Sequence, residues 1–523
     1  MPRLVFEQQL PANGPVANRA DVALFVGFVA VRAPLAVDPD LPDRLKTPLQ
    51  HWMETTGWLG GPYQRPIEDL RRLRDIPVPI GCWAAFDSLF AWEERPIVQS
   101  GDQGAGTFLG AAVRSFFAQG GRKCYVVRAA DPLPVTSWRP ERFDAFPRLV
   151  PGFPNSLDVT PSDRSTWRGV GHVLGLPDVS FLCLPDLPDS FGVDQIAMSL
   201  PASPSEGAES FVECSAPVAA AVDDSALRRL RVPRCDTAGY RDWARAVLLI
   251  TDLLARFQRE VQLVAAFPQP EDSATATDLL RGAVELGLLD QPMGVGPRSF
   301  SSAFLQLVYP WVRTPGSARL AEQLEPPDGV LAGVLARNAL THGTYVSAGN
   351  QPLGDVFEAV PALRARDREP SLEISVDALS PVDRLTLIGR TPGGMRLLSD
   401  VTTAISLPYR QAPVCRLVSA IVRAARLLGE EMVFEVSAPP VWAQVRDRMT
   451  DLMTGLWQAG AIRGDSRRDA FSVRCDSGTM SQQDIDEGRL IVEITFEATL
   501  SIERITIVLA LQDGGLSAIR SAA

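Results

Sequence analysis

The sequence predicts a multi-domain protein of mixed α/β (α+β) class. With 523 residues, the chain exceeds the size at which a single hydrophobic core keeps growing, so two to four domains are expected. Hydrophobic residues make up 46% and charged residues 22%, which argues against a disordered chain and against a membrane protein. Helical and strand patterns both occur along the chain, which indicates the mixed class.

The first third of the chain contains a strand-helix-strand pattern. From Val22 the run VALFVGFVAV has the character of a buried strand, and residues 33–75 read as an insertion without strong periodicity. A short strand over residues 76–80 precedes GAGTFLGAAVRSFFAQGG, in which apolar residues recur at helical spacing, and CYVVR follows as a strand. This order predicts a βαβ-like unit around residues 76–128.

The middle of the chain is rich in proline between residues 131 and 240. Strands are predicted near VSFLCL and FVEC, and a helix is predicted around residues 241–258. We expect residues 131–299 to form a peripheral inserted domain.

The last third predicts two amphipathic helices followed by three strands. The first helix is marked by apolar residues at helical spacing and ends at Gly429. The second opens at Pro439, buries one face that includes Trp442, and ends at Gly460. The strands are FSVRC, RLIVEITF and ERITIVLALQ.

Charge and cysteine usage exclude several classes of partner. The net charge of −11 offers no overall attraction for nucleic acid or an anionic membrane, so neither is expected as a partner. The seven cysteines stand singly, which argues against a disulfide framework and a zinc site and fits a reducing cytoplasm. The first residues lack an apolar core, so no signal peptide is expected.

Catalytic motifs were sought without success. His51, His172 and His342 lie in unrelated contexts, and neither a nucleophile elbow nor a phosphate-binding loop is present. The glycines between residues 101 and 110 favour tight packing at a helix start, and the aromatic residues of RSFFAQGG favour a core role. Asp484 and Asp486 are interpreted as turn or capping residues. We therefore expect no enzyme activity, cofactor or metal.

Four segments resemble the contractile tail sheath protein family. The most specific is MVFEVSAPPVWAQVRDRMTDLMTGLWQAGAIRG with FSVRCDSGTMSQQDIDEGRLIVEITF, over residues 432–496. The others are VALFVGF, GAAVRSFFAQGGRKCYVVR, and YPWVR with PPDGVLAGVLARNALTHGTY, in the expected order. This resemblance implies a structural subunit that polymerises helically around an inner tube and contracts to drive it into a target. The particle would be a phage tail or a phage-tail-like injection system, assembled in the bacterial cytoplasm, with or without later release.

Three departures from the family pattern leave alternatives open. VSAPP stands where a Pro-Asn turn is usual, LPYRQAPVCRL replaces an Asn-Val-Arg-Arg run, and residues 33–75 look inserted. The chain could therefore be a specialised sheath paralogue, or a baseplate-proximal or cap component. The alternative from another class is a nucleotide-binding α/β enzyme built on the βαβ-like unit.

The resemblance also implies a domain plan and a set of partners. The plan comprises an N-terminal arm (1–20), an outer sheath domain (21–130 and 300–395), the peripheral domain (131–299), an inner C-terminal domain (396–500) and a C-terminal arm (501–523). The expected partners are copies of the chain in stacked rings, the inner tube protein, baseplate and cap proteins, and sheath paralogues.

Two sets of residues are predicted to make the assembly contacts. Sheath relatives imply that terminal strands add to a neighbour's sheet, and the alternative is that they pair within their own subunit. These strands contain Leu4, Val5, Phe6, Ile505, Ile507, Leu509 and Leu511. Contact with the tube is assigned to arginines on the two late helices, and the alternative is a solvated helix face. These arginines are Arg416, Arg423, Arg426, Arg446 and Arg448.

Overall fold

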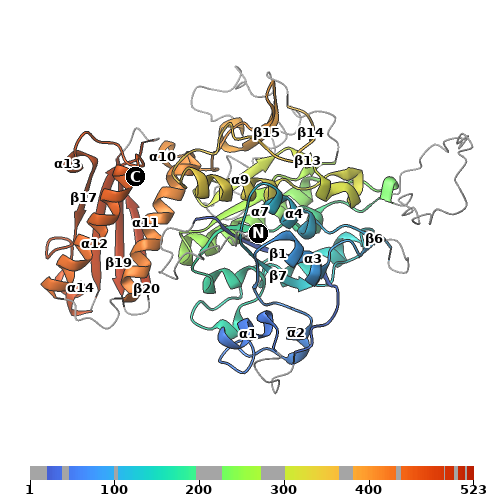
Figure 1. The fold of residues 1–523 in the computed structure, drawn as a ribbon, viewed down its shortest axis with the longest axis horizontal. Coiled ribbons are helices and arrows are strands. Elements are labelled where there is room, and N and C mark those ends of the chain that lie inside the picture. The colour runs from blue at the N-terminus through green and yellow to red at the C-terminus, as the bar shows by residue number, and fades with distance from the viewer. Residues whose placement is uncertain are drawn as a thin grey trace, which may run out of the picture. The chain divides into compact units, whose positions relative to one another are not determined.

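The computed structural model divides the chain into two compact units, each described separately here (Figure 1). The larger unit comprises Asp21–Ser419 with Ala498–Glu503, and the smaller unit comprises Met1–Ala20, Ala420–Glu497 and Arg504–Ala523. The structure describes residues 20–37, 46–98, 104–195, 227–271, 301–363, 381–431, 438–487, 489–499, 504–512 and 515–522. The division at Ser419 falls inside the domain predicted from residue 396 onward.

The larger unit is built on an eight-stranded sheet of order β16-β15-β12-β10-β8-β1-β7-β3. The six inner strands run parallel, whereas β3 and β16 pair antiparallel at the two edges. The strands are β1 (Val22–Phe28), β3 (Val78–Ile80), β7 (Cys124–Ala130), β8 (Val179–Cys183), β10 (Gln262–Ala266), β12 (Leu305–Tyr309), β15 (Thr386–Thr391) and β16 (Gly394–Leu397). Every residue of β1 is buried, as its continuous apolar run predicts.

Helices cover both faces of this sheet. Alternate residues of β1 point to opposite faces, so Leu24 packs in one hydrophobic core and Phe25 in the other. The Leu24 core includes residues of α7 (Thr237–Phe257), and the Phe25 core includes α4 (Phe108–Ala118) and α9 (Asp328–Thr341). The sheet is therefore sealed from solvent on both sides.

Shorter elements complete the larger unit. The helices are α1 (Pro48–Thr55), α2 (Ile67–Arg71), α3 (Trp83–Leu89), α5 (Arg139–Ala145), α6 (Leu187–Phe191) and α10 (Leu407–Arg410). The strands are β2 (Ala30–Val31), β4 (Phe90–Ala91), β5 (Arg95–Pro96), β6 (Gly104–Ala105), β9 (Arg234–Cys235), β11 (Gln269–Pro270), β13 (Trp311–Arg313) and β14 (Glu358–Val360). Turns of 3-10 helix are η2 (Phe146–Arg148), η3 (Arg164–Thr166), η4 (Gly169–Gly175), η5 (Leu227–Arg229), η6 (Pro315–Arg319), η7 (Ala321–Gln323) and η9 (Pro381–Arg384).

Close packing explains the glycines at the start of α4. Thr107 caps the helix, since its side chain accepts a hydrogen bond from the backbone N–H of Gly110 at 3.1 Å. A Cβ atom on Gly110 would lie 2.4 Å from Cβ of Trp92, so only glycine fits there. At the other end, Gly120 adopts a φ of 105° and stops the helix. The prediction of tight packing at this helix start is confirmed.

Two sequence predictions about the larger unit are wrong. The strand β3 pairs antiparallel with β7, so the parallel crossover through α4 begins at β1 and not at the strand near residue 76. The strands β8 and β10, both within residues 131–299, lie next to one another in the middle of the sheet. These residues therefore supply central strands and do not form a separate peripheral domain over their described length. In both cases the strand pairs are set by contacts far apart in the sequence.

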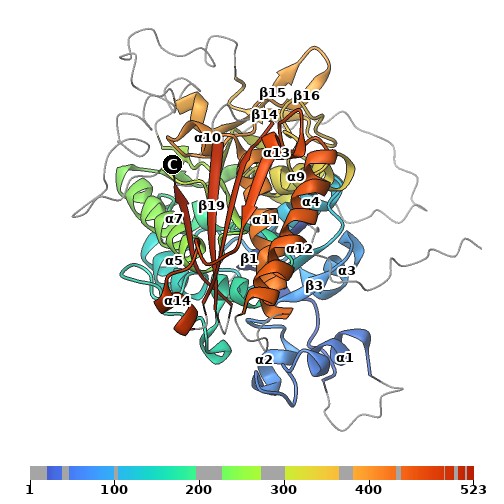
Figure 2. The same ribbon diagram turned by 90° about the vertical axis from the view of Figure 1, so that its left-hand side faces the viewer.

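The smaller unit is a four-stranded antiparallel sheet with two long helices on one face (Figure 2). Its sheet order is β17 (Phe471–Arg474), β18 (Leu490–Glu497), β19 (Arg504–Gln512) and β20 (Gly515–Ala522). Its helices are α11 (Ala412–Glu431, from Ala420 onward), α12 (Pro439–Gln458), α13 (Arg467–Ala470) and α14 (Gln482–Asp486). The two long helices and the first three strands were predicted, although α11 continues past Gly429 to Glu431, and the short helices α13 and α14 were not predicted.

No helix in the part of the chain that the structure describes combines the length and the apolar content needed to cross a membrane.

Candidate assembly surface and buried charge clusters

The sheet of the smaller unit has one buried face and one partly exposed face. Along β18, buried and half-buried residues alternate without exception from Leu490 to Glu497. Along β19, Ile505, Ile507 and Leu509 are buried, which matches the two-residue period expected for their strand. These three side chains therefore belong to the core of the smaller unit.

In the single chain, β19 is paired along both edges. Its neighbours are β18 on one side and β20 on the other, and the backbone of Leu511 pairs with Leu490 and with Leu516. The strand β20 lies in the predicted C-terminal arm, in a stretch for which no strand was predicted. Addition of these strands to a neighbouring subunit stays a prediction. Leu4, Val5 and Phe6, predicted as the second arm, lie outside the described residues.

The helix α12 separates core residues from charged residues around its circumference. Trp442, Val445, Met449 and Met453 are buried, as the apolar stripe in the sequence predicts. Arg446 and Arg448 lie off this stripe, with side chains 44% and 57% exposed.

Each exposed arginine of α12 has only a loose ion pair at the surface. Arg446 contacts the Asp447 carboxylate at 3.4 Å, and Arg448 contacts Glu431 at 3.3 Å. Both acidic partners are at least half exposed, and pairs of this kind contribute little to stability. The two guanidinium groups are therefore accessible to a partner.

The prediction that Arg416 faces the tube is wrong. Its side chain is 5% exposed and makes a bidentate ion pair with the fully buried Asp400, with N–O distances of 3.0 and 2.6 Å. Arg416 also donates from Nε to the carbonyl oxygen of Thr344 at 3.1 Å. No local pattern links Asp400 to Arg416 in the sequence, so the pair could be found only from the structure.

Asp400 is the centre of a hydrogen-bonded cluster in the larger unit. Its carboxylate accepts from the Gln306 side chain at 2.9 Å and from the backbone N–H of Ala348 at 2.7 Å, in addition to Arg416. Burial opposes ionisation here, but the guanidinium and these donors outweigh it and lower the pKa of Asp400. The cluster fixes the first turn of α11 to β12 and to the segment after α9.

The remaining predicted tube contacts differ from one another in exposure. Arg423 is 3% exposed, which is a second correction to the predicted set, and Arg426 is half-buried. Of the five arginines, only Arg446 and Arg448 are exposed in the described chain.

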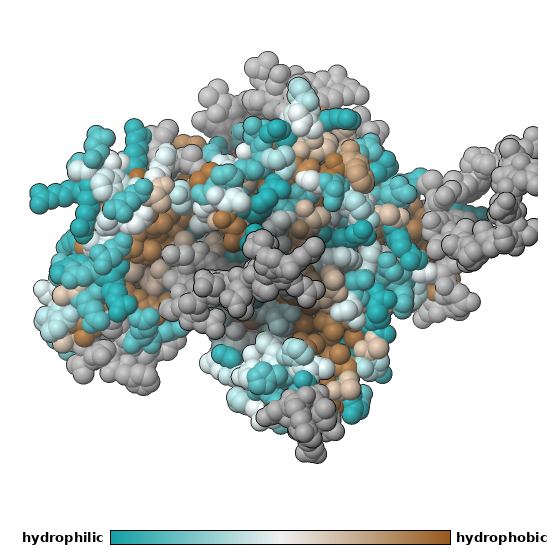
Figure 3. Space-filling model, in the orientation of Figure 1, coloured by the Kyte–Doolittle hydropathy of each residue, from teal (hydrophilic) through white to brown (hydrophobic). Residues whose placement is uncertain are grey.

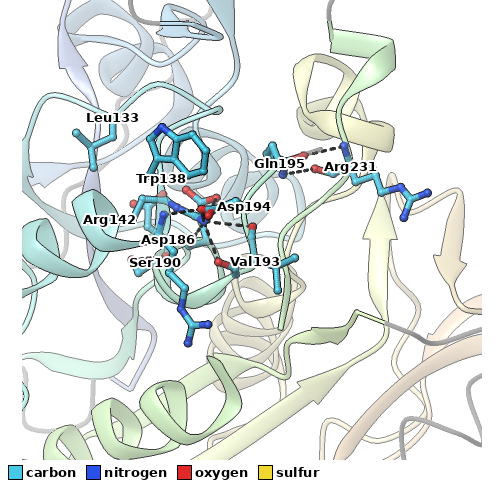
Figure 4. Close-up of polar contacts among 12 residues, drawn as sticks. Leu133, Trp138, Arg142, Asp186, Ser190, Val193, Asp194, Gln195 and Arg231 are labelled. Carbon is cyan, nitrogen blue, oxygen red and sulfur yellow. Dashed lines mark hydrogen bonds and ion pairs between the residues drawn. The ribbon is translucent and has the colours of Figure 1, made fainter. Parts of the chain in front are cut away.

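A second charge cluster lies at the carboxyl ends of the parallel strands β1 and β8 (Figure 4). Arg142 on α5 donates to the backbone oxygens of Asp189 at 2.6 Å and Gly192 at 2.8 Å. Arg95 makes an ion pair with the Asp189 carboxylate at 2.7 Å. Asp186 accepts a hydrogen bond at 2.7 Å from the backbone N–H of Phe28, the last residue of β1. These contacts hold the strand ends to α5 and α6.

The carboxyl end of a parallel sheet is where α/β proteins usually bind ligands. The cavity lined by Phe28, Arg95, Asp186 and Asp189 has a volume of about 20 Å³, which is enough for one water molecule and not for a nucleotide. Burial raises the pKa of Asp186 to about 7. The cluster therefore serves to close the sheet end.

Two more buried carboxyl groups stand beside α9. The Glu325 carboxyl accepts from the Ser115 hydroxyl at 2.5 Å, and burial raises its pKa to about 8. Asp328 accepts from the backbone N–H of Gly329 at 3.0 Å, and burial again raises the pKa to about 8. One oxygen of each group, Oε2 and Oδ2, has no hydrogen-bond partner. Burial is the largest cause of both raised pKa values, and at Glu325 the Arg114 guanidinium acts in the opposite direction.

Other residues that the sequence analysis examined for a catalytic or binding role take part in packing or helix capping. His172 is buried and contacts the Asp75 carboxylate at 3.1 Å. Asp484 caps α14 by accepting from Ser481, as the capping interpretation predicts. Phe116 of the RSFFAQGG segment is fully buried. Within the described ranges, no group of three potential metal ligands occurs, and the described cysteines are free thiols.

Known proteins give one sequence match and several structural matches. A segment of 254 residues is 24% identical to the tail sheath protein of Burkholderia phage BcepMu (isolate -/United States/Summer/2002), covering 45% of this chain and 52% of that protein. The match thus spans about half the length of the phage protein. No model of a protein family matches the chain.

The structural matches extend over nearly the whole chain. A chain of the anti-feeding prophage (AFP) helical sheath in the contracted state has 19% identity and a TM-score of 0.52, covering 96% of both chains. A chain of the AFP baseplate in the contracted state has 17% identity and a TM-score of 0.54, covering 95% of this chain and 94% of the other. A chain of the PVC sheath complex, an extracellular contractile injection system in the contracted state, has 17% identity and a TM-score of 0.50, covering 92% and 88%.

The fold of this chain is that of the contractile sheath proteins. The sequence match is to a tail sheath protein and the structural matches include sheath chains, so both comparisons repeat the resemblance found in the sequence motifs.

Proposed function

We propose that this chain is a structural subunit of a contractile sheath. Such a subunit polymerises helically around an inner tube and contracts to drive that tube into a target. The observation that carries the proposal is the match to an AFP sheath chain, which extends over 96% of both chains. The role is mechanical and requires no catalytic group. The partners would be copies of the chain, the inner tube, baseplate and cap proteins, and sheath paralogues, with assembly in the bacterial cytoplasm.

The two sheets suggest how such a subunit could move without losing its neighbours. The larger unit has a sheet sealed on both faces, which suits a body that rotates as one piece. The smaller unit ends in the long strands β19 and β20, and the proposal assigns these to pairing with a neighbour's sheet. Backbone hydrogen bonds along such strands would hold the lattice together while the bodies repack. The energy would be stored when the extended lattice assembles and released on contraction.

Exposed hydrophobic side chains are candidates for contacts between bodies. Figure 3 shows hydrophilic side chains over most of the described surface on one face, with hydrophobic patches between them. The larger unit exposes Trp138 to 66%, Phe357 to 65% and Leu407 to 64%. Contiguous hydrophobic patches mark sites of contact with other proteins, and the proposal assigns these three side chains to such contacts.

A second position in the particle is favoured by one observation. The AFP baseplate chain has a TM-score of 0.54, which is no lower than the 0.52 of the helical sheath chain. A sheath-like subunit confined to the layer beside the baseplate, or to the cap, is therefore the alternative.

Electron microscopy of the chain produced with and without its tube protein tests the proposal. A bulk sheath subunit should form long hollow rods and should enclose the tube along its length. A baseplate-proximal subunit should form single rings that bind the tube only together with baseplate proteins. Particles of dispersed single chains under all these conditions would refute a role in the sheath.

A further inference from the structure

An aromatic hollow in the larger unit has no role in the proposed sheath function. It has a volume of about 530 Å³, within the usual range for small-molecule sites. Six of the residues that line it carry the argument below. They are Trp52, Trp58, Tyr63, Arg164, Trp167 and Asp178.

The aromatic walls of the hollow are held in place by their neighbours. Trp58 packs against the ring of Tyr63, with centroids 6.2 Å apart, and against His172 at 5.6 Å. Arg65 donates to the backbone oxygen of Trp167 at 2.6 Å. Trp52, on α1, is half-buried. The rings therefore form a rigid lining, which lowers the entropic cost of binding a ligand against them.

Arg164 stands at the wall in a fixed position. Its guanidinium carbon lies 4.4 Å from the ring centroid of Tyr63 and 5.3 Å from that of Trp167. Among the described residues the group has no hydrogen bond or ion pair. Stacking on two rings thus orients a cation whose N–H donors are available to a ligand.

Acceptors are present in the same hollow. Asp178 accepts from Nζ of Lys123 at 2.6 Å and from the Tyr125 hydroxyl at 3.3 Å, both at Oδ2, and a carboxylate has about four acceptor sites in all. His172 also lines the hollow and is 1% exposed. Its Nε2 contacts Asp75, whereas its Nδ1 has no hydrogen-bond partner, so this buried ring edge retains an unused polar atom.

We propose that this hollow binds a neutral saccharide. A sugar ring presents a C–H face, which packs on aromatic rings, and hydroxyl groups, which both donate and accept hydrogen bonds. The half-buried Trp52 supplies the first kind of surface, with Trp58 buried behind the lining, and Arg164 and Asp178 supply the matching donors and acceptors. Arg164 and Asp178 carry opposite charges, so an uncharged ligand is favoured over an ion.

Two other ligand classes fit the geometry less well. A quaternary ammonium group would meet the Arg164 guanidinium inside the aromatic lining and be repelled. A proline-rich peptide needs an open groove between aromatic side chains, but Arg164 already occupies the space over both Tyr63 and Trp167. The inference is independent of the proposed sheath function.

The test uses the labelled full-length chain on an array of neutral mono- and oligosaccharides, followed by titration of the best binder by tryptophan fluorescence. We expect saturable binding that weakens at least tenfold in Arg164→Ala and in Trp52→Ala. The matched controls are Arg256→Ala, which removes an arginine that is 59% exposed on α7, and Trp138→Ala, which removes an exposed tryptophan outside the hollow. Both controls should bind like the original chain.

Several outcomes would overturn the proposal. Absence of binding to every saccharide on the array is one, and unchanged affinity in Arg164→Ala is another. Binding of a polyproline peptide in place of the sugars would assign the hollow to a protein partner. If Trp52→Ala fails to fold, Arg164→Ala decides the question, since that side chain is exposed and has no ion pair to lose.

Discussion

The two sheets of this protein differ in what they leave exposed. In the larger unit the seven residues of β1 are all buried, and helices cover both faces. In the smaller unit buried residues of β18 alternate with half-buried ones such as Glu493 and Thr495, so only one face is sealed. The difference indicates that the larger sheet serves as a rigid body, whereas the smaller sheet retains a face and edges for partners.

The arginines that were predicted to contact the tube also differ in exposure. Arg416 and Asp400 are both buried in the larger unit and form an ion pair. Asp400 also accepts hydrogen bonds from the Gln306 side chain and from the backbone N–H of Ala348. Arg446 and Arg448 in the smaller unit are exposed and paired loosely. The Arg416–Asp400 pair is therefore part of the fold of the larger unit, whereas the Arg446 and Arg448 guanidinium groups are accessible to a partner.

Deletion of residues 503–523 should have the largest effect. The structure places β19 between β18 and β20, so this deletion removes a central strand with three buried side chains. We expect the smaller unit to unfold while the larger unit keeps its structure. Limited proteolysis with mass spectrometry would reveal cleavage confined to residues beyond 420.

A shorter deletion, of residues 513–523, is the matched control. It removes only the edge strand β20 and leaves the β18–β19 pair intact. The truncated chain should fold, and if the terminal strand joins neighbouring subunits it should not polymerise. Sheaths of normal length formed from this chain would contradict the predicted role of the C-terminal arm.

Asp400→Ala should destabilise the larger unit strongly. The substitution leaves the Arg416 guanidinium buried without its partner, which typically costs roughly 3 to 5 kcal/mol. Urea unfolding followed by circular dichroism measures the change in free energy. The control Glu431→Ala removes the exposed partner of Arg448 and should change stability by about 0.5 kcal/mol or less. Equal effects of the two substitutions would show that Arg416 is not held as the structure places it.

Local patterns were sufficient to predict the long elements with strong periodicity, such as β1, α4, α12 and β18. The apolar stripe that contains Trp442 and Met449 has the period of a helix, and the alternating residues of β18 have the period of a strand. Each pattern depends only on neighbours in the sequence, and these elements were placed correctly.

Contacts between distant residues could not be predicted in this way. The order of β8, β1 and β7 in the sheet depends on which strand pairs with which, and no residue in these apolar runs encodes it. Arg416 has the spacing of an exposed helix residue, and only Asp400, placed beside it by the fold, explains its burial. The aromatic hollow likewise combines Trp52 with Arg164, more than a hundred residues further along the chain.

The stability of the larger unit should fall as pH rises from about 4 to about 8. Glu325 and Asp328 have pKa values raised to about 8 by burial, so the folded chain keeps protons that the unfolded chain loses from about pH 4 upward. The stability that these two groups contribute is fully present below their pKa in the unfolded chain, about 4. It is lost as pH rises through their pKa in the folded chain, about 8. Glu325→Gln cannot ionise and should remove roughly 4 kcal/mol from the change across this range.

The measurement is the slope of unfolding free energy against pH between 4 and 9. Glu358→Gln provides the control, because this glutamate pairs with Arg313 at the surface and is about half exposed. Its slope should match that of the original chain. A Glu325→Gln slope as steep as the original would mean that Glu325 is ionised in the folded protein.

Reversing the charge of Arg446 and Arg448 to Glu should have the smallest effect on stability. Both side chains are exposed and lie off the Trp442 stripe, so we expect a change of about 0.5 kcal/mol or less. If these arginines face an acidic surface of the tube, repulsion at every subunit is repeated along the lattice, and the extended sheath should not form on the tube.

Contracted sheath provides the comparison that decides what these arginines do. If contraction moves the subunits outward from the tube, as the proposed mechanism requires, the doubly substituted chain should still polymerise into contracted rods without tube inside. Electron microscopy distinguishes three results. Contracted rods without enclosed tube would support contact between these arginines and the tube, because only the extended lattice, which touches the tube, would be lost. Normal extended particles would show that Arg446 and Arg448 form a solvated face, and loss of both kinds of rod would place them at a contact between subunits, where repulsion acts in either lattice.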